Sequence, residues 1–261
     1  MHSNLAVIHP EAIIGKNVSV GPFALIDKDV IIGDNCRIHP HAIIYEGARI
    51  GNNCEVFPGA VIAGIPQDLK FKGEVTTVEI GNNTTIRECV TVNRGTASKG
   101  RTIVGSNCLI MAYSHIAHDC EIKDQVIIGN ATQLAGEVEI DDFAIISGGA
   151  LVHQFTRISK HVMIQGGSRV GKDIPPYTLI GRDPIVYCGI NIVGLRRRGF
   201  TNDQVYQIQD IYRTIYSRGL NNTDAIQCIE TEYEVTEERN LILEFIKSSK
   251  RGIVRGSIDD L

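Results

Sequence analysis

The sequence predicts a mainly β protein, a parallel β-helix of hexapeptide repeats followed by an α-helical C-terminal region. Two observations lead to this prediction. An aliphatic residue recurs every six positions in three runs between residues 8 and 170, and an amphipathic helical pattern replaces that period near the C-terminus. No α-helix has a period of six and a simple strand has a period of two, so the pattern indicates short strands bent at regular corners.

The six-residue step occupies three runs that together contain 25 aliphatic residues. Four positions after each of the first nine lies a small or β-branched residue, which suits the inside of a corner. The phase breaks at 63–79 and 93–102, where we expect loops. The aliphatic positions are Ile8, Ile14, Val20, Ile26, Ile32, Ile38, Ile44, Ile50, Val56, Ile62, then Ile80, Ile86, Val92, then Val104, Ile110, Ile116, Ile122, Ile128, Leu134, Ile140, Ile146, Val152, Ile158, Ile164 and Val170.

Three hexapeptides close one triangular coil of 18 residues, and each coil pairs its backbone with the next at a spacing of roughly 4.8 Å. Burial of each inward Ile or Val contributes about 1.5–3 kcal/mol, which offsets the ordering of a long solenoid. We therefore expect a β-helix over residues 1–186 and a helical domain over residues 187–261.

The C-terminal region contains signals for several helices. Thr201 and Gln204 form a capping box, and Gly219 suits the end of the helix that follows. Two more helical stretches begin near Thr223 and Thr236. Because solenoid ends must be capped, this region is expected to cover the last coil, and we expect that it also supplies ligand contacts. One face of the first helix carries Val205, Ile208, Ile211, Tyr212, Ile215 and Tyr216.

Composition excludes several classes of protein. The 261 residues have a net charge of −4 and a pI of about 6.1, which argues against a general nucleic-acid binder. No stretch has the roughly 18 uninterrupted apolar residues of a membrane span, and the N-terminus lacks a secretory signal pattern. Seven cysteines without CxxC or zinc spacing favour reduced thiols in a cytoplasmic protein.

The 18-residue coil places three polar or bare positions in one vertical column. His118, Gly136 and Gln154 are 18 apart, and each lies two residues after an inward aliphatic, so each faces outward. Asp119 beside His118 can fix the imidazole tautomer and make it a better general base. The Gly136 N–H can donate a hydrogen bond to a substrate oxyanion. The alternatives are a solvated surface histidine and a glycine that only satisfies a corner.

Other candidate groups are weaker. His115, His118 and His153 suggest a three-histidine zinc site, but one chain places them poorly for a tripod, so only a site between chains stays open. The cysteines Cys36, Cys54 and Cys120 fall on inward corners and are expected to be packing residues without nucleophilic reactivity. Two basic clusters suit phosphates or an acidic protein. They are Arg157, Lys160, Arg169 and Lys172 in one, and Arg196, Arg197 and Arg198 in the other.

The chain resembles the bacterial UDP-N-acetylglucosamine O-acyltransferases, which catalyse the first step of lipid A synthesis, along essentially its whole length. The resemblance implies a left-handed β-helix and a homotrimer with active sites between neighbouring chains. Acyl transfer from a thioester, which is already activated, is expected to need no cofactor or metal. The stretches that carry it are IPQDLKFKGE (65–74), TVNRGT (91–96), HIAHDC (115–120), NATQLAGEVEIDDFAII (130–146), VHQF (152–155), DIPPYTLI (173–180) and NIVGLRRRGF (191–200).

The implied reaction moves an acyl group, usually a 3-hydroxyacyl chain, from an acyl carrier protein thioester to the 3-hydroxyl of UDP-N-acetylglucosamine. By resemblance His118 is the general base, Asp119 its orienting partner and Gly136 the oxyanion donor, while the basic face receives the acidic carrier protein. The substrate-binding positions implied are Asp68, Lys70, His115 and Gln154 for the amino sugar or its phosphates, Gly166 for a long acyl chain, and Asn191, Arg197 and Arg198 for the nucleotide.

Three positions depart from the pattern expected of the family. Glu137 replaces a His after the oxyanion glycine, Val193 replaces a Glu near the nucleotide, and Pro184 replaces a His that some members have near the acyl tail. Three alternative functions fit the sequence less well. An N-acyltransferase of the same pathway usually carries an extra N-terminal domain, for which a repeat starting at Ile8 leaves no room. A zinc hydratase needs histidines between chains, and a non-enzymatic solenoid has a regular outward ladder that this sequence lacks.

Overall fold

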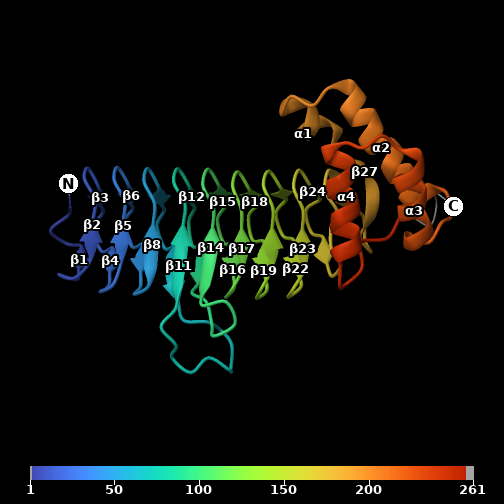
Figure 1. The fold of residues 1–261 in the computed structure, drawn as a ribbon. Coiled ribbons are helices and arrows are strands. Elements are labelled where there is room, and N and C mark those ends of the chain that lie inside the picture. Colours follow the sequence, from blue (N-terminus) through green and yellow to red (C-terminus); the bar gives the residue numbers. More distant parts are fainter. Residues whose placement is uncertain (1, 257–261) are drawn as a thin grey trace.

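The computed structural model describes residues 2–256, which form a three-sided prism of stacked coils with helices at its C-terminal end (Figure 1). The first wall is a nine-stranded parallel sheet. Its strands, in spatial order, are β1 (Val7–Ile8), β4 (Leu25–Ile26), β7 (Ile43–Ile44), β10 (Val61–Gly64), β13 (Thr91–Asn93), β16 (His115–Ile116), β19 (Gln133–Leu134), β22 (Leu151–Val152) and β25 (Arg169–Val170).

The second wall is an eight-stranded parallel sheet, and the third is a ten-stranded sheet whose last pair is antiparallel. The second contains β2 (Ile13–Ile14), β5 (Ile31–Ile32), β8 (Ala48–Ile50), β11 (Thr77–Ile80), β14 (Arg101–Val104), β17 (Glu121–Ile122), β20 (Glu139–Ile140) and β23 (Arg157–Ile158). The third contains β3 (Ser19–Val20), β6 (Arg37–Ile38), β9 (Glu55–Val56), β12 (Thr85–Ile86), β15 (Leu109–Ile110), β18 (Ile127–Ile128), β21 (Ile145–Ile146), β24 (Met163–Ile164), β26 (Thr178–Gly181) and β27 (Val186–Ile190).

The register confirms the predicted coil of 18 residues. Val7 pairs with Leu25 at the start of the prism, and Ile116 pairs with Leu134 near its middle. The inward aliphatic residues form one core, which is almost completely closed to solvent from Val20 onward. The corner thiols of Cys36, Cys54 and Cys120 are buried in it, as predicted.

The three edges of the prism are needed to describe the site, so each is named by one residue. The His118 edge joins the nine-stranded to the eight-stranded sheet, and the Arg198 edge lies where the eight-stranded sheet turns into the ten-stranded sheet. The Gly166 edge joins the ten-stranded sheet back to the nine-stranded one. Corner residues adopt left-handed backbone conformations, as at Asn17 (φ 57°) and Asn53 (φ 56°), which asparagine tolerates well.

Two segments interrupt the coils at the predicted breaks, but each is shorter than expected. β10 continues to Gly64 and β11 begins at Thr77, so the first loop is 65–76. The second loop is 94–100, between β13 and β14. Both loops leave the prism at the His118 edge, where Figure 1 shows them projecting below the coils in cyan and green.

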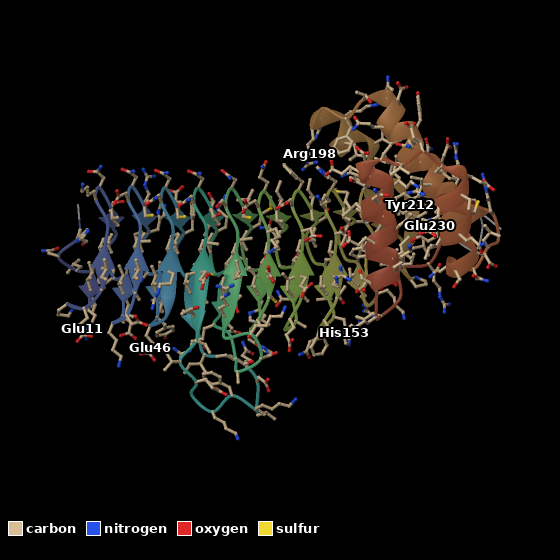
Figure 2. All side chains as sticks on the ribbon, viewed as in Figure 1. Glu11, Glu46, His153, Arg198, Tyr212 and Glu230 are labelled. Carbon is tan, nitrogen blue, oxygen red and sulfur yellow. The ribbon has the colours of Figure 1, made fainter. Side chains whose placement is uncertain are left out.

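The helical region caps the last coils. It contains α1 (Ile192–Arg197), α2 (Asn202–Ser217), α3 (Asn222–Glu232) and α4 (Glu237–Ser248). The Thr201–Gln204 capping box is present, and Thr236 caps α4. Val254 packs into the coil core, and the Tyr212 hydroxyl, which Figure 2 places among the helices, donates to the Pro176 carbonyl (2.5 Å).

Two C-terminal features differ from the sequence prediction. The short helix α1 was not predicted, and the predicted boundary between residues 186 and 187 falls inside β27. That strand pairs with β26, and its Tyr187 packs against both the coil core and the helical core. The six-residue period could not predict this strand, because the strand folds back on the last coil and does not follow the repeat.

Candidate active site

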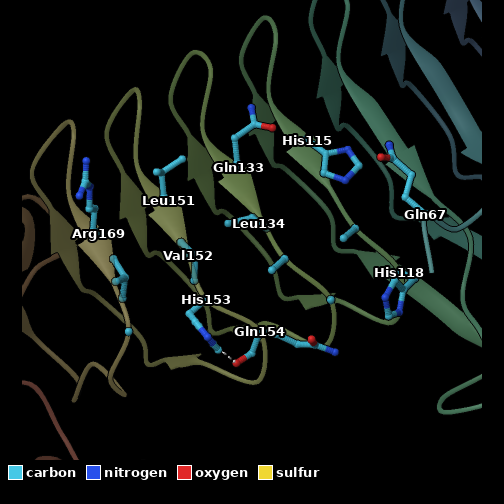
Figure 3. A pocket seen from close by; sticks show the side chains of 15 residues that line it. Gln67, His115, His118, Gln133, Leu134, Leu151, Val152, His153, Gln154 and Arg169 are labelled. Carbon is cyan, nitrogen blue, oxygen red and sulfur yellow. Dashed lines mark hydrogen bonds between the residues drawn. The ribbon is translucent and has the colours of Figure 1, made fainter. Parts of the chain in front are cut away.

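An open groove of about 580 Å³ runs beside the His118 edge towards the C-terminal end of the prism. Figure 3 shows His115 and His118 at one end and Arg169 at the other. All three histidines considered for a metal tripod line this groove, as do Gly136 and Gln154. Among residues 2–256, no group of three or more His, Cys, Asp or Glu side chains is arranged to hold a metal ion.

The predicted column at the His118 edge is present. Gly136 lies one coil beyond His118, and a Cβ built on Gly136 would fall 2.6 Å from Cε1 and 2.7 Å from Nε2 of the imidazole. A side chain there would therefore collide with the ring, which explains the glycine. Within residues 2–256, the Gly136 N–H has no hydrogen-bond acceptor, while its carbonyl accepts from the N–H of Phe155.

His118 is held by a buried carboxylate. Its Nδ1 lies 2.8 Å from Oδ2 of Asp119, which is completely buried, whereas the imidazole keeps 12% of its surface exposed. An ionised carboxylate can only accept, so Nδ1 carries the proton and Nε2 is left as the basic atom. The Nε2 atom lies 4.0 Å from Oδ2 of Asp68, on the first loop.

Asp119 is kept ionised by the second loop. Burial alone would raise the pKa of Asp119, but hydrogen bonds from the hydroxyl and N–H of Thr96, from His118 and from the N–H of Lys99 outweigh it and lower that pKa. The Asp119 backbone is left-handed (φ 60°), and its N–H donates to the Thr102 hydroxyl (2.8 Å). The carboxylate is therefore both charged and fixed at the pH of the cell.

The second imidazole of the groove, His115, favours the neutral form. Burial and the neighbouring His118 lower the pKa of His115, and its Nδ1 lies 2.7 Å from the Thr91 hydroxyl. A neutral imidazole fixed on one side can offer its other nitrogen to a ligand in the groove. In the first loop, Oδ1 of Asp68 accepts from the N–H of Lys70 (2.9 Å), and the Lys70 side chain is exposed.

The remaining predicted site residues lie on other edges of the prism. Gly166 is at the Gly166 edge and does not line the groove, and a Cβ on it would lie 3.0 Å from the Gly148 carbonyl oxygen. Arg198 is at the Arg198 edge, where its guanidinium stacks 5.0 Å from the Phe143 ring and donates to the Phe143 carbonyl. Burial lowers the pKa of Arg198. Figure 2 places Arg198 and His153 on opposite sides of the prism.

Asn191 is engaged within the fold. Its Oδ1 accepts from the N–H of Gly194 as the cap of α1, and its Nδ2 donates to the His161 carbonyl (3.0 Å). Arg197 on the same helix is exposed. One chain thus brings His118, Asp119, Gly136, Asp68, His115 and Gln154 together, and leaves Gly166, Asn191, Arg197 and Arg198 elsewhere.

Sequence reasoning missed the residues that support Asp119. Thr96, Lys99 and Thr102 belong to the second loop and its flanking strand, where the 18-residue step that located the column is broken. The only sequence signal was the position of this loop between the two coils that precede His118. Gln67 and Gln133 also line the groove and were not predicted.

Two sequence profiles match the chain. One is described as bacterial transferase hexapeptide (six repeats) and matches residues 29–64 and 101–136, and the other, Udp N-acetylglucosamine O-acyltransferase, Domain 2, matches residues 173–254. The curated acyl-[acyl-carrier-protein]--UDP-N-acetylglucosamine O-acyltransferase of Xylella fastidiosa is 46% identical over 252 residues, which is 96% of each chain. The protein of the same name from Janthinobacterium is 44% identical over 96% of this chain and 97% of that one.

Solved structures of similar proteins superpose on this chain along almost its whole length. The UDP-N-acetylglucosamine acyltransferase of Bacteroides fragilis superposes with a TM-score of 0.97 at 57% identity, over 98% of this chain and all of that one. The Francisella novicida enzyme gives 0.95 at 40% identity, over 100% and 95% of the two chains. A coil of the opposite hand could not superpose this well, and the predicted left-handed parallel β-helix is confirmed.

Proposed function

This chain belongs to the UDP-N-acetylglucosamine O-acyltransferase family, and we propose that it transfers an acyl chain from an acyl carrier protein thioester to the 3-hydroxyl of UDP-N-acetylglucosamine. The observation that carries the proposal is the His118 imidazole, fixed by a buried carboxylate on one side and stacked on the bare backbone of Gly136 on the other. That arrangement supplies a base and an amide donor within one groove.

The chemistry requires one proton carrier and one oxyanion donor. Nε2 of His118 takes the proton of the sugar hydroxyl as its oxygen bonds to the thioester carbon, and the carbonyl oxygen gains the negative charge. The Gly136 N–H donates to that oxyanion. The intermediate then expels the thiolate as the C–S bond breaks, and the imidazolium returns the proton to the sulfur. General-base help contributes roughly 10²–10⁴ in rate and one oxyanion donor about 10²–10³.

The acceptor is assigned to the end of the groove nearest the first loop. Asp68 approaches the basic Nε2 atom, His115 is neutral, and Lys70 is exposed for a phosphate. Gln154, one coil beyond Gly136, is assigned to the sugar as well. The departure at Glu137 leaves these groups in place, because Glu137 follows Gly136 and does not line the groove.

The donor is assigned to the opposite end. There the groove reaches Arg169, and Arg251 lies beside it, donating to the Gly171 carbonyl (3.2 Å) and contacting His153 Nδ1 (3.2 Å). The exposed Lys172 follows on the next corner. An acidic carrier protein that delivers a thioester into this groove meets a basic surface at its mouth.

A homotrimer would allow residues on different edges of the prism to serve one active site. Gly166, Arg198 and His118 lie on three different edges of one prism, so a single chain cannot bring all three to one ligand. Neighbouring chains packed side by side can bring different edges together. Apolar surface supports such contacts, because Leu69 and Val75 on the first loop are fully exposed and an outward row of Leu109, Ile127, Ile145 and Met163 follows the ten-stranded wall. Asn191, Arg197 and Arg198 then serve the nucleotide, and Gly166 the acyl chain.

The proposal is tested by an acyl-transfer assay with UDP-N-acetylglucosamine and carrier-protein thioesters of graded chain length. We expect ester formation at the 3-hydroxyl with a long-chain optimum. No transfer with any thioester in the series contradicts the proposed function, and a short-chain optimum contradicts only the assignment of Gly166.

Shared sites are tested by subunit mixing. His118→Ala and Arg198→Ala proteins, each of which we expect to be much slower than the wild type alone, are dissociated, mixed and reassociated. If a site takes His118 from one chain and Arg198 from another, some mixed trimers contain an intact site and regain activity. No regain in verified mixed trimers contradicts sites between chains.

A further inference from the structure

The second loop, residues 94–100, hydrogen-bonds to Asp119 of the His118–Asp119 pair through Thr96 and Lys99. Thr96 on this loop is 8% exposed, and Asp119 is completely buried beneath it. Neither Thr96 nor any other residue of the loop lines the groove. The loop therefore contacts the carboxylate of the pair without lining the groove.

Both carboxylate oxygens of Asp119 are used. Oδ1 accepts from the N–H groups of Thr96 (2.9 Å) and Lys99 (3.1 Å). Oδ2 lies between the Thr96 hydroxyl (2.6 Å) and Nδ1 of His118 (2.8 Å). Thr96 thus contacts both oxygens, and its hydroxyl donates to the same oxygen that accepts the hydrogen bond from the imidazole Nδ1–H.

We propose that Thr96 is a positioning residue for acyl transfer, which holds Asp119 so that His118 carries its proton on Nδ1 and leaves Nε2 free in the groove. The inference rests on the proposed function of His118. Charged hydrogen bonds of this kind are stronger than neutral ones and fix direction as well as distance. Without the hydroxyl, Oδ2 can rotate away from the imidazole, and both tautomers become accessible.

The competing explanation is that Thr96 only shapes its own loop. Its hydroxyl oxygen also accepts from the N–H of Ser98 (3.2 Å), a contact that would matter for loop conformation in any protein. The two explanations differ in one respect: a positioning role acts through Asp119 and disappears when Asp119 is removed, whereas a loop-shaping role does not.

The test uses three single variants. Thr96→Val removes the hydroxyl with little change in volume, Thr96→Ser keeps it, and Thr156→Val is a matched control because Thr156 is a buried threonine of the same edge whose hydroxyl has no partner within residues 2–256. We expect Thr96→Val to lower kcat about 10- to 100-fold, with unchanged KM for the sugar nucleotide. We expect Thr96→Ser and Thr156→Val to stay near wild type.

A double-mutant cycle with Asp119→Ala decides between the explanations. We expect Thr96→Val to change kcat by less than about twofold in the Asp119→Ala background, because coupled residues are not additive. The same fold-loss in both backgrounds, a Thr96→Ser variant as slow as Thr96→Val, or wild-type kcat in Thr96→Val overturns the proposal.

A readout without acyl transfer separates this inference from the proposed function. Nitrogen NMR of protein labelled in histidine reports which ring nitrogen of His118 is protonated. We expect the Nδ1–H tautomer in the wild type and in Thr96→Ser, and a mixture of tautomers in Thr96→Val. An unchanged tautomer in Thr96→Val overturns the positioning role even if the wild type proves inactive towards every thioester.

Discussion

Two histidines at corners of the same β-helix have opposite surroundings. His118, at the His118 edge, has a buried carboxylate on Nδ1 and a groove beside its ring. His161, at the Arg198 edge, stacks on the rings of Phe143 (4.8 Å) and Tyr177 (5.7 Å), and within residues 2–256 its Nδ1 has no hydrogen-bond partner. Burial and the nearby cations lower the pKa of His161 to about 4.

The difference lies in what each edge adds to a common corner. At the His118 edge, a loop inserted between two coils provides donors that hold Asp119 ionised, so the imidazole gains a fixed anion. At the Arg198 edge, the helical cap provides Phe200 and Arg198, an aromatic edge and a cation, which disfavour protonation of the imidazole. Whether a corner histidine can act as a base therefore depends on the charges and rings that the neighbouring loop or helical cap places beside it.

The largest predicted difference concerns catalysis by the two imidazoles. His118→Ala should lower kcat roughly 10²- to 10⁴-fold, because the general base is lost. His161→Phe should leave kcat within about twofold, since a phenyl ring preserves the stack and no proton is transferred there. Both variants are measured in the same acyl-transfer assay, after sedimentation confirms that each assembles as the wild type does. Equal losses of kcat in the two variants would contradict the assignment of His118 alone as the base.

The next largest effect tests the glycine under the ring. Gly136→Ala should lower kcat about 10²- to 10³-fold, because the methyl group displaces the His118 ring and disturbs the oxyanion donor. Gly171→Ala is the comparison, as a Cβ at Gly171 meets no atom within 4 Å although this residue also lines the groove. The loss of kcat in Gly171→Ala should be at least about tenfold smaller than in Gly136→Ala, because the added methyl group meets no neighbouring atom. Similar losses at both positions would show that the groove simply cannot tolerate added volume.

The smallest effect concerns stability at the Arg198 edge. The folded-state pKa of His161 lies below its unfolded value of 6.5, so the unfolded chain binds the proton first as pH falls. The resulting loss of stability begins below pH 6.5 and is complete near pH 4, amounting to about 3 kcal/mol at most. His161→Phe should lose less stability than the wild type between pH 7 and 4.5 in denaturant titrations. Parallel losses in the two proteins would contradict this burial effect.

The sequence alone predicted the parts of the molecule that follow the repeat. The 18-residue coil placed His118 next to Gly136, because parallel pairing in a closed coil turns sequence spacing directly into stacking. It did not predict the support of Asp119 by Thr96, which depends on how a seven-residue loop folds back, nor the separation of Arg198 from His118, which depends on where the helical cap begins. The β26–β27 hairpin and α1 were missed for the same reason, since neither continues the period.

Chemical rescue tests whether the His118 imidazole takes the sugar proton. Acyl transfer by His118→Ala is measured as free imidazole is added. We expect a slow variant whose rate rises in proportion to neutral imidazole, while Gly136→Ala gains nothing. A folded His118→Ala protein with the turnover of the wild type, or an equal gain in both variants, would contradict it.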